Sequence, residues 1–201
     1  MIVAETVSNS SYKLPPSGLV LGTLVRILDL GTQKVTWQGA TKMQRKVMFT
    51  FELHGDGYAM DDGKPMIQSK RYTLSLNQQS GLRADLESWA GKGLTEEQLK
   101  GFNLKDLLGK WVYLNLTHTE RDGKTYCNIM GLNPVPSSVA KAGFPPIENP
   151  FVYLNLQEYD QTVFNGLSEG LKQVIQQSAE WQNRNGVAPS DTNEELNDIP
   201  F

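Results

Sequence analysis

The stretch WVYLNLTHTERDGKTYCNIM occupies residues 111–130 and carries the clearest local structural signal in the chain. Two strand-like runs, Trp111–His118 and Tyr126–Met130, lie on either side of an Asp122-Gly123 dipeptide. Asp-Gly favours tight turns in which both central residues have positive φ angles, the turn type that joins antiparallel strands. The stretch therefore predicts a β-hairpin.

Three further strands are expected upstream of this hairpin. The first covers residues 19–30, and Gly22 within it indicates a bulge or bend. The second covers residues 47–53, where alternate apolar side chains predict one buried face. Turn-forming residues at 54–65 separate it from a third strand at 67–76.

The period of the apolar residues changes between the third strand and the hairpin. Leucine and tryptophan side chains recur at helical spacing between Ser80 and Gly91, which predicts a first helix. A capping box that begins at Thr95 predicts a second short helix, and residues 103–108 predict a further helical turn. The order is three strands, a helical insert and two strands. That order predicts a mainly β protein built on a five-stranded OB-fold, a Greek-key barrel with its helix between strands three and four.

The remaining sequence divides into a linker, a helix and a tail. The first half of residues 134–182 contains five prolines, which is typical of a linker. An apolar stripe in the second half predicts one helix from Asp160 to Trp181. Such a helix is expected to dock on the barrel or on another chain. Residues 183–201 are polar and acidic, which predicts a disordered tail. The expected units are thus a nucleic-acid-binding domain at 1–133, a linker with a docking helix at 134–182, and a tail at 183–201.

Charge is unevenly distributed along the 201 residues, although the net charge is only −3. Residues 1–133 hold 16 basic and 13 acidic residues, whereas residues 134–201 hold 3 and 9. A mildly basic body with an acidic end is typical of a nucleic-acid-binding module.

Composition also bears on the compartment. Cys127 is the single cysteine, which is consistent with a reducing cytoplasm, and its strand position predicts a buried structural side chain. No apolar run reaches membrane-spanning length, and no signal-peptide pattern opens the sequence, so a cytoplasmic protein without membrane contact is expected.

The most basic segment of the chain joins the first two expected strands. Residues 31–44 are expected to form a loop that continues into Arg45 and Lys46, and residues 31–46 contain no acidic side chain. Lys34, Lys42, Arg45 and Lys46 can neutralise phosphates, and Trp37 can stack on an unpaired base. The alternative is a solvated hairpin tip with Trp37 folded back onto the barrel.

Other candidate nucleic-acid contacts lie on later elements. Lys70 and Arg71 belong to the third strand, and Arg121 and Lys124 flank the hairpin turn. Tyr113 and Tyr126, like Trp111, alternate with aliphatic residues and are expected outside the barrel interior. These aromatic residues could stack on bases, cover the docked helix or fill a subunit interface.

An enzymatic function has little support. The two histidines, His54 and His118, lie at strand ends, and the aspartates at positions 56, 61 and 62 crowd one turn without the spacing of a calcium loop or a zinc site. Phosphate-cradling and nucleophile motifs are missing from the sequence. We therefore expect a binding protein with no cofactor and no metal.

The sequence ends on Asp198-Ile199-Pro200-Phe201 after an acidic stretch. Such an ending can act as a hook, because Phe201 fills a partner's pocket while its terminal carboxylate meets a basic side chain. This ending resembles the C-terminal tip of bacterial-type single-stranded-DNA-binding proteins. The resemblance implies recruitment of replication, recombination and repair enzymes.

The resemblance extends over most of the chain to single-stranded-DNA-binding proteins encoded by phages and mobile elements. It is carried by Pro16-x-Gly18 with Gly22, by the run from Arg26 to Gln33, and by the late segment from Leu171 to Trp181. The resemblance implies that the protein binds single-stranded DNA without sequence preference. If a phage encodes the protein, it acts in the cytoplasm of the bacterial host. The resemblance also allows a homo-oligomer. A protein-interaction adaptor and an RNA-binding module remain the alternatives.

Overall fold

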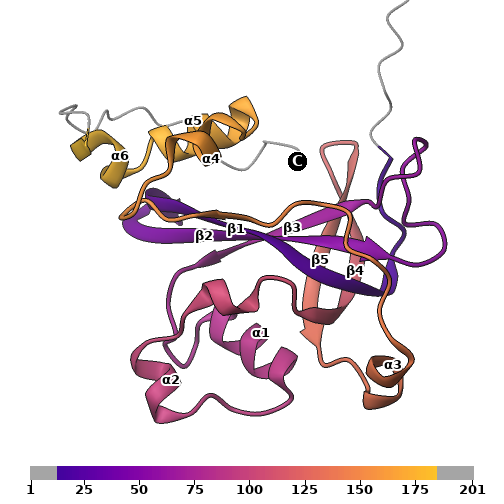
Figure 1. Cartoon of the computed structure of the whole chain (residues 1–201). Coiled ribbons are helices and arrows are strands. Elements are labelled where there is room, and N and C mark those ends of the chain that lie inside the picture. The colour runs from indigo at the N-terminus through magenta and orange to yellow at the C-terminus, as the bar shows by residue number, and fades with distance from the viewer. Residues whose placement is uncertain (1–12, 185–201) are drawn as a thin grey trace, which may run out of the picture.

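The computed structural model describes residues 13–184 and shows a mainly β protein, as predicted (Figure 1). Six strands form one sheet in the order β3-β2-β1-β4-β5, with β6 paired to β1. All pairings are antiparallel except that of β6, which runs parallel to β1. The strands are β1 (Gly18–Trp37), β2 (Ala40–His54), β3 (Ile67–Thr73), β4 (Trp111–Arg121), β5 (Lys124–Asn133) and β6 (Val152–Leu154). The helices are α1 (Gly81–Ala90), α2 (Glu96–Lys100), the 3-10 turn η1 (Leu104–Leu107), α3 (Ser137–Ala142), α4 (Gln161–Asn165), α5 (Glu169–Gln176) and α6 (Ala179–Arg184).

The β4–β5 hairpin confirms the prediction made from residues 111–130. Its turn residues Asp122 and Gly123 have φ angles of 50° and 73°. Such left-handed values suit the right-handed twist of the paired strands, and glycine adopts them without steric cost.

The predicted loop at residues 31–44 is wrong. β1 and β2 continue through it as a long hairpin that turns at Gln38 and Gly39, whose φ angles are 48° and 79°. The strands stay paired almost to the tip, where the hydroxyl oxygens of Thr36 and Thr41 lie 3.0 Å apart. β-Branched residues and a two-residue turn outweigh the polar composition that suggested a loop.

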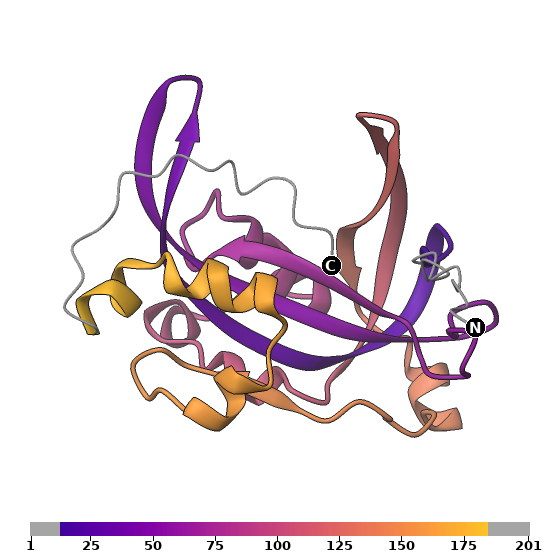
Figure 2. The ribbon, with the colours of Figure 1, turned by 90° about the horizontal axis from the view of Figure 1, so that it is seen from above.

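The β1–β2 and β4–β5 hairpins extend beyond the rest of the sheet and point toward the same side of the molecule (Figure 2). The end strands β3 and β5 also approach each other, since the Gln68 side-chain amide donates to the Cys127 carbonyl over 2.7 Å. The sheet is therefore strongly curved, with the two hairpins rising from its two halves.

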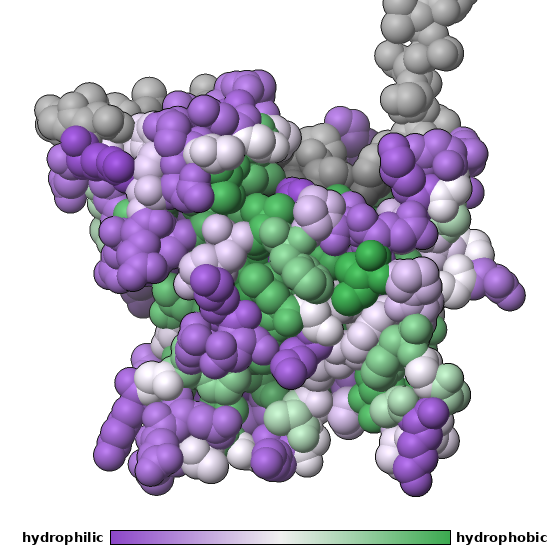
Figure 3. All heavy atoms as spheres, viewed as in Figure 1, coloured by the Kyte–Doolittle hydropathy of each residue, from purple (hydrophilic) through white to green (hydrophobic). Residues whose placement is uncertain are grey.

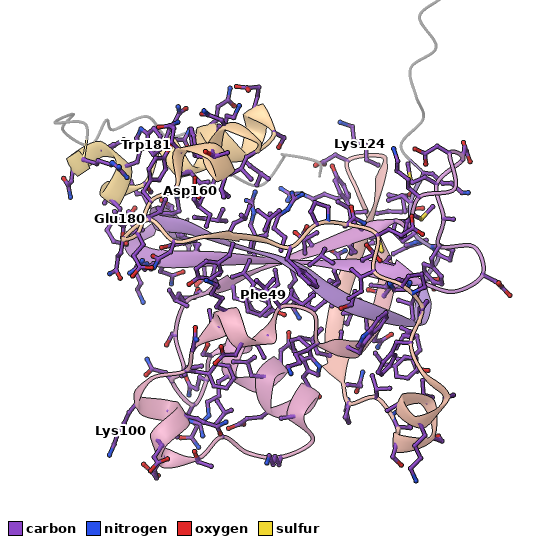
Figure 4. The ribbon with its side chains drawn as sticks, in the orientation of Figure 1. Phe49, Lys100, Lys124, Asp160, Glu180 and Trp181 are labelled. Atoms are coloured by element: carbon purple, nitrogen blue, oxygen red, sulfur yellow. The ribbon has the colours of Figure 1, made fainter. Side chains whose placement is uncertain are left out.

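The principal core lies between the sheet and α1. Val47, Phe49, Phe51 and Leu53 are all buried on the inner face of β2, as the alternation predicted. Phe49 lies at the centre, between the sheet and the helical insert (Figure 4). Three residues of α1 complete this core: Leu82, Leu86 and Trp89.

The C-terminal helices form a second core on the opposite face of the sheet (Figure 1). Leu28 and Met48 supply the sheet side of this core, and the helix side comes chiefly from apolar residues of α4 and α5. A single helix from Asp160 to Trp181 is wrong, because the segment breaks into α4, α5 and α6. Asp160 does cap the first of them, since its carboxylate accepts from the amide of Thr162 over 2.8 Å.

Residues 134–160 are held against the sheet. They contain α3, and β6 adds to β1 opposite residues 26–28. The buried Glu52 carboxylate of β2 accepts from the amide of Asn149 over 2.6 Å and from its side-chain nitrogen over 2.7 Å. The segment predicted as a linker is thus fixed by backbone pairing and by a buried carboxylate.

Strand β3 ends at Thr73, three residues before the predicted end. The Ser75 amide donates to the Thr73 carbonyl over 2.8 Å, which turns the chain away from β2 toward α1.

Candidate nucleic-acid interface

The register of the β1–β2 hairpin places its basic residues on two faces. Lys34 pairs with Met43, and Lys42 pairs with Val35. Because successive side chains in a strand point to opposite faces, Lys42 and Lys46 lie on one face, and Lys34 and Arg45 lie on the other. Lys34 and Lys42 are exposed. The hairpin can therefore present a cation to a ligand on either side.

Trp37 is the last residue of β1 and pairs with Ala40 across the tip. Its side chain lies outside the described part of the structure, so base stacking by Trp37 stays a prediction. The backbone position places it beyond the body of the sheet, at the end of the hairpin.

Arg45 takes part in an ion pair at the base of the hairpin. Its guanidinium contacts the two carboxylate oxygens of Asp29 at 2.5 and 3.3 Å. The hydrogen bond with Asp29 is the main reason that the pKa of Arg45 is raised. Asp29 also accepts from the backbone amide of Leu156 over 3.3 Å. The Asp29 carboxylate thereby joins Arg45 of the hairpin to the segment that follows β6.

Lys46, Lys70 and Arg71 gather around one pocket at the end of β3. The Lys70 ammonium lies 2.7 Å from the carboxylate of Asp85 in α1. The Tyr72 hydroxyl donates to the same oxygen over 2.7 Å, and burial raises the pKa of Tyr72. Asp85 thus neutralises Lys70 from the helix that borders the pocket.

The β4–β5 hairpin carries the remaining basic candidates at its tip. Arg121 and Lys124 pair directly across the turn and are both exposed. Lys124 lies at the tip of the hairpin (Figure 4). Arg121 also contacts the Asp122 carboxylate at 3.5 Å. Tyr126 lies two residues along from Lys124 and shares its face. This hairpin therefore combines two cations and an aromatic ring on one surface.

The aromatic candidates of β4 are not equally accessible. Trp111 stacks on Phe144, with ring centroids 4.5 Å apart and planes 4° from parallel, so a base cannot occupy that face. Tyr113 is half-buried, as is Tyr126. Phe144 and Phe151 are exposed in part, and apolar residues form a band across the face seen in Figure 3.

Arg26 is a candidate that the sequence analysis did not include. It lies on β1 opposite Thr50 and is half-buried, and its Nε atom has no hydrogen-bond partner within residues 13–184. Burial lowers the pKa of Arg26. The available signal was a lone arginine between the apolar residues Val25 and Ile27, which indicates a cation directed away from the core.

The residues weighed for an enzymatic site are engaged in structural contacts. His54 Nε2 lies 3.0 Å from a carboxylate oxygen of Glu52, and burial lowers the pKa of His54. His118 Nε2 lies 2.8 Å from the Pro15 carbonyl oxygen. Asp62 pairs with Lys64 at 3.0 Å in an exposed turn. The described residues include no group of three or more His, Cys, Asp or Glu side chains that could hold a metal ion.

The tip residues Asp198, Ile199, Pro200 and Phe201 lie outside the described residues, so their partner-binding role stays a prediction. Within residues 13–184, none of the helices has the length and apolar character needed to cross a membrane. No protein-family model matches the chain, and no curated protein matches it.

Proposed function

We propose that the protein binds single-stranded DNA without sequence preference through an OB-type barrel, and that its terminal residues Asp198–Phe201 recruit replication, recombination or repair proteins. The observation that supports DNA binding most directly is the pair of projecting hairpins. They point to the same side, and their outer parts carry exposed basic residues (Figure 2). These residues are Lys34, Lys42, Arg121 and Lys124.

The strand order supports the OB-type assignment. β1 pairs with both β2 and β4, and one side-chain hydrogen bond brings β3 close to β5, an arrangement compatible with a five-stranded barrel. In OB-folds the loops between strands one and two and between strands four and five border the ligand groove. The two projecting hairpins occupy these two positions.

The C-terminal helices limit where a strand can lie. They cover the face of the sheet around Leu28 and Met48, which leaves the β3 and β5 side for a ligand between the hairpins. Arg71 and Tyr126 belong to these two strands. A single strand would place phosphates near the cations and splay its bases toward aromatic rings, whereas the bases of a duplex are already stacked.

Titration of the full chain with labelled oligo-dT at two salt concentrations tests the proposal. Binding should be tight at low salt and should weaken steeply as salt is added, because added salt reduces the free energy gained from counterion release. A duplex of the same length should bind much more weakly, and an RNA strand serves to detect a preference for the 2′-hydroxyl. Equal binding of duplex and single strand, or no binding of any oligonucleotide, would overturn the DNA assignment.

Recruitment by the tip needs its own measurement. A chain lacking residues 198–201 should bind oligo-dT but lose the capture of repair and replication proteins from a bacterial extract, because the pocket-filling side chain and its carboxylate are gone. Equal capture by the shortened and full chains would contradict the recruiting role. A Phe201→Ala chain is a milder variant that keeps the terminal carboxylate.

A further inference from the structure

A pocket of about 540 Å³ lies where the end of β3 meets the beginning of α1. Its walls combine the basic side chains of Lys46, Lys70 and Arg71 with hydroxyl groups, including those of Thr73 and Ser75. Gly81, the first residue of α1, forms part of the wall beside the helix. Lys46 comes from β2, so three separate elements contribute to the pocket.

The two lysines of this pocket differ in their partners, because Lys70 has an acidic partner and Lys46 has neutral ones. The Lys70 ammonium is neutralised by Asp85, which lies one turn into α1. Lys46 donates instead to neutral oxygens, over 2.7 Å to the Gln44 side chain and over 3.0 Å to the Thr73 hydroxyl. Arg71 adds a second cation on the same face of the sheet as Lys46.

Lys46 and Arg71 are both half-buried, and burial lowers the pKa of each. A half-buried ammonium with neutral hydrogen-bond acceptors gains when an anion enters, because the anion replaces lost hydration with a charge-assisted hydrogen bond. Hydroxyl donors beside the two cations suit a ligand with several acceptor oxygens. A phosphate group meets this requirement better than an apolar ligand would.

We propose that this pocket is a phosphate-binding subsite in which Lys46 and Arg71 contact the anion, with Thr73 and Ser75 as neutral hydrogen-bonding groups around it. The inference rests on the proposed function only for the source of the phosphate, a phosphodiester of the bound strand. Lys42 and Lys46 share one face of the β1–β2 hairpin, so a strand can pass from the exposed hairpin to the pocket along one row of cations.

Gly81 allows a test that leaves the cations in place. A Cβ atom at Gly81 would meet no heavy atom within 4 Å, so a larger side chain has room. Gly81→Glu places a carboxylate at the pocket, and a glutamate in the first helical turn favours the helix. Gly81→Gln has nearly the same shape without the charge and is the matched control.

The measurement is a ¹H–¹⁵N NMR titration of the full chain with inorganic phosphate at constant ionic strength. Saturable shifts are expected at residues 46, 73 and 81. In Gly81→Glu the apparent Kd should rise by at least about tenfold, whereas in Gly81→Gln it should stay within about twofold of the wild type. Absence of saturable shifts in the wild type, or equal affinity in the two variants, would overturn the subsite.

A second pair of variants examines the cation itself. Lys46→Gln should also raise the apparent Kd for inorganic phosphate by about tenfold. Lys100→Gln removes the same charge from exposed α2, which contributes no residue to the pocket lining, and should leave the Kd unchanged. An unchanged Kd in Lys46→Gln would remove Lys46 from the proposed contact set.

Oligo-dT binding by the same variants separates this inference from the proposed function. Weaker oligo-dT binding by Gly81→Glu than by Gly81→Gln would place a strand phosphate in the pocket. If oligo-dT binds all variants equally while inorganic phosphate binding responds, the site accepts free phosphate and the strand as its source is wrong. If the wild type binds phosphate but no oligonucleotide, the proposed function fails while the subsite stands.

Discussion

The Glu180 carboxylate holds Thr32 through two hydrogen bonds, although 148 residues separate them. It accepts from the Thr32 amide over 2.6 Å and from the Thr32 hydroxyl over 2.7 Å. Thr32 lies at the base of the long β1–β2 hairpin, and Glu180 belongs to α6 (Figure 4). The last described helix is thus fixed to the strand that carries the basic hairpin.

Glu180→Gln should lower the free energy of unfolding by about 1–3 kcal/mol at pH 7, because one of two hydrogen bonds to a charged acceptor is lost. Urea unfolding measures this difference. Glu169→Gln is the control, since the Glu169 side chain is 81% exposed in its ion pair with Lys172 and should change stability little.

The same contact should make stability depend on pH. Burial alone would raise the pKa of Glu180, but the hydrogen bonds from Thr32 outweigh it and the net shift is downward from 4.5. A carboxylate with a lowered pKa in the folded state stabilises the fold above its ordinary pKa, and this contribution is lost as the pH falls through the lowered value. The difference between wild type and Glu180→Gln should therefore shrink from pH 7 to about pH 3. A constant difference would contradict the assigned ionisation.

Gly31→Ala should be more damaging than the same change at the hairpin tip. Gly31 has a φ of 73°, and a Cβ there would lie 2.6 Å from the Ser178 hydroxyl and 2.8 Å from a Glu180 oxygen. The left-handed backbone costs about 1–2 kcal/mol for alanine, and overpacking adds about 1–3 kcal/mol. Gly39→Ala shares the positive φ but meets no atom within 4 Å. Thermal unfolding of both variants separates strain from overpacking; equal losses would show that the α6 contact is unimportant.

The elements predicted correctly are those specified by local sequence. The Asp122-Gly123 turn carries its own backbone preference, and the alternation over residues 47–53 identifies a buried face without knowledge of its partner. The capping box at Thr95 forms as predicted, with Gln98 as its reciprocal partner. Each of these signals is contained within a few neighbouring residues.

The features that were not predicted depend on contacts distant in sequence. Pairing of β6 with β1 joins residues 126 apart in sequence, and the contact of Asn149 with Glu52 joins residues 97 apart. No local period reveals such contacts. The hairpin at residues 31–44 differs from the predicted loop because its polar composition is typical of loops and does not distinguish them from exposed paired strands. Exposed paired strands beyond a core can be polar on both faces.

In the candidate site, too, local features could be predicted from the sequence, whereas contacts between distant segments could not. Its basic residues were identified from composition, but composition does not show that Lys70 is paired with Asp85 or Arg45 with Asp29. Those partners come from other elements. Arg26 stands alone between the apolar residues Val25 and Ile27, so it belongs to none of the basic clusters that composition identifies.

Glu52→Gln should destabilise the fold substantially, because the buried carboxylate accepts from the backbone amides of Glu148 and Asn149 and has no exposed surface. Replacing one carboxylate oxygen by an NH2 group sets donor against donor, with an expected loss of about 2–4 kcal/mol in urea unfolding. Asp61→Asn is the control, since its side chain is 95% exposed. Similar stability of both variants would contradict a structural role for Glu52.

Cys127 should react slowly with alkylating reagents in the folded protein. The residue is buried, and burial raises the pKa of its thiol to about 11, so little thiolate exists at pH 8. Iodoacetamide labelling followed by mass spectrometry should be slow under native conditions and rapid in denaturant. Equally fast labelling in both conditions would contradict the burial of Cys127.

The exposed lysines of the β1–β2 hairpin should control the salt dependence of oligo-dT binding. A chain carrying Lys34→Gln and Lys42→Gln loses two potential phosphate contacts, and each contact to a single strand contributes about 0.7 to the slope of log K against log salt. The slope should therefore become shallower by about 1.4, with weaker binding at low salt. The matched control carries Lys92→Gln and Lys100→Gln, which remove the same charge from exposed positions on or beside the helical insert, away from both hairpins. If the two double variants lose slope equally, net charge rather than the position of the hairpin governs binding, and the hairpin does not contact the strand.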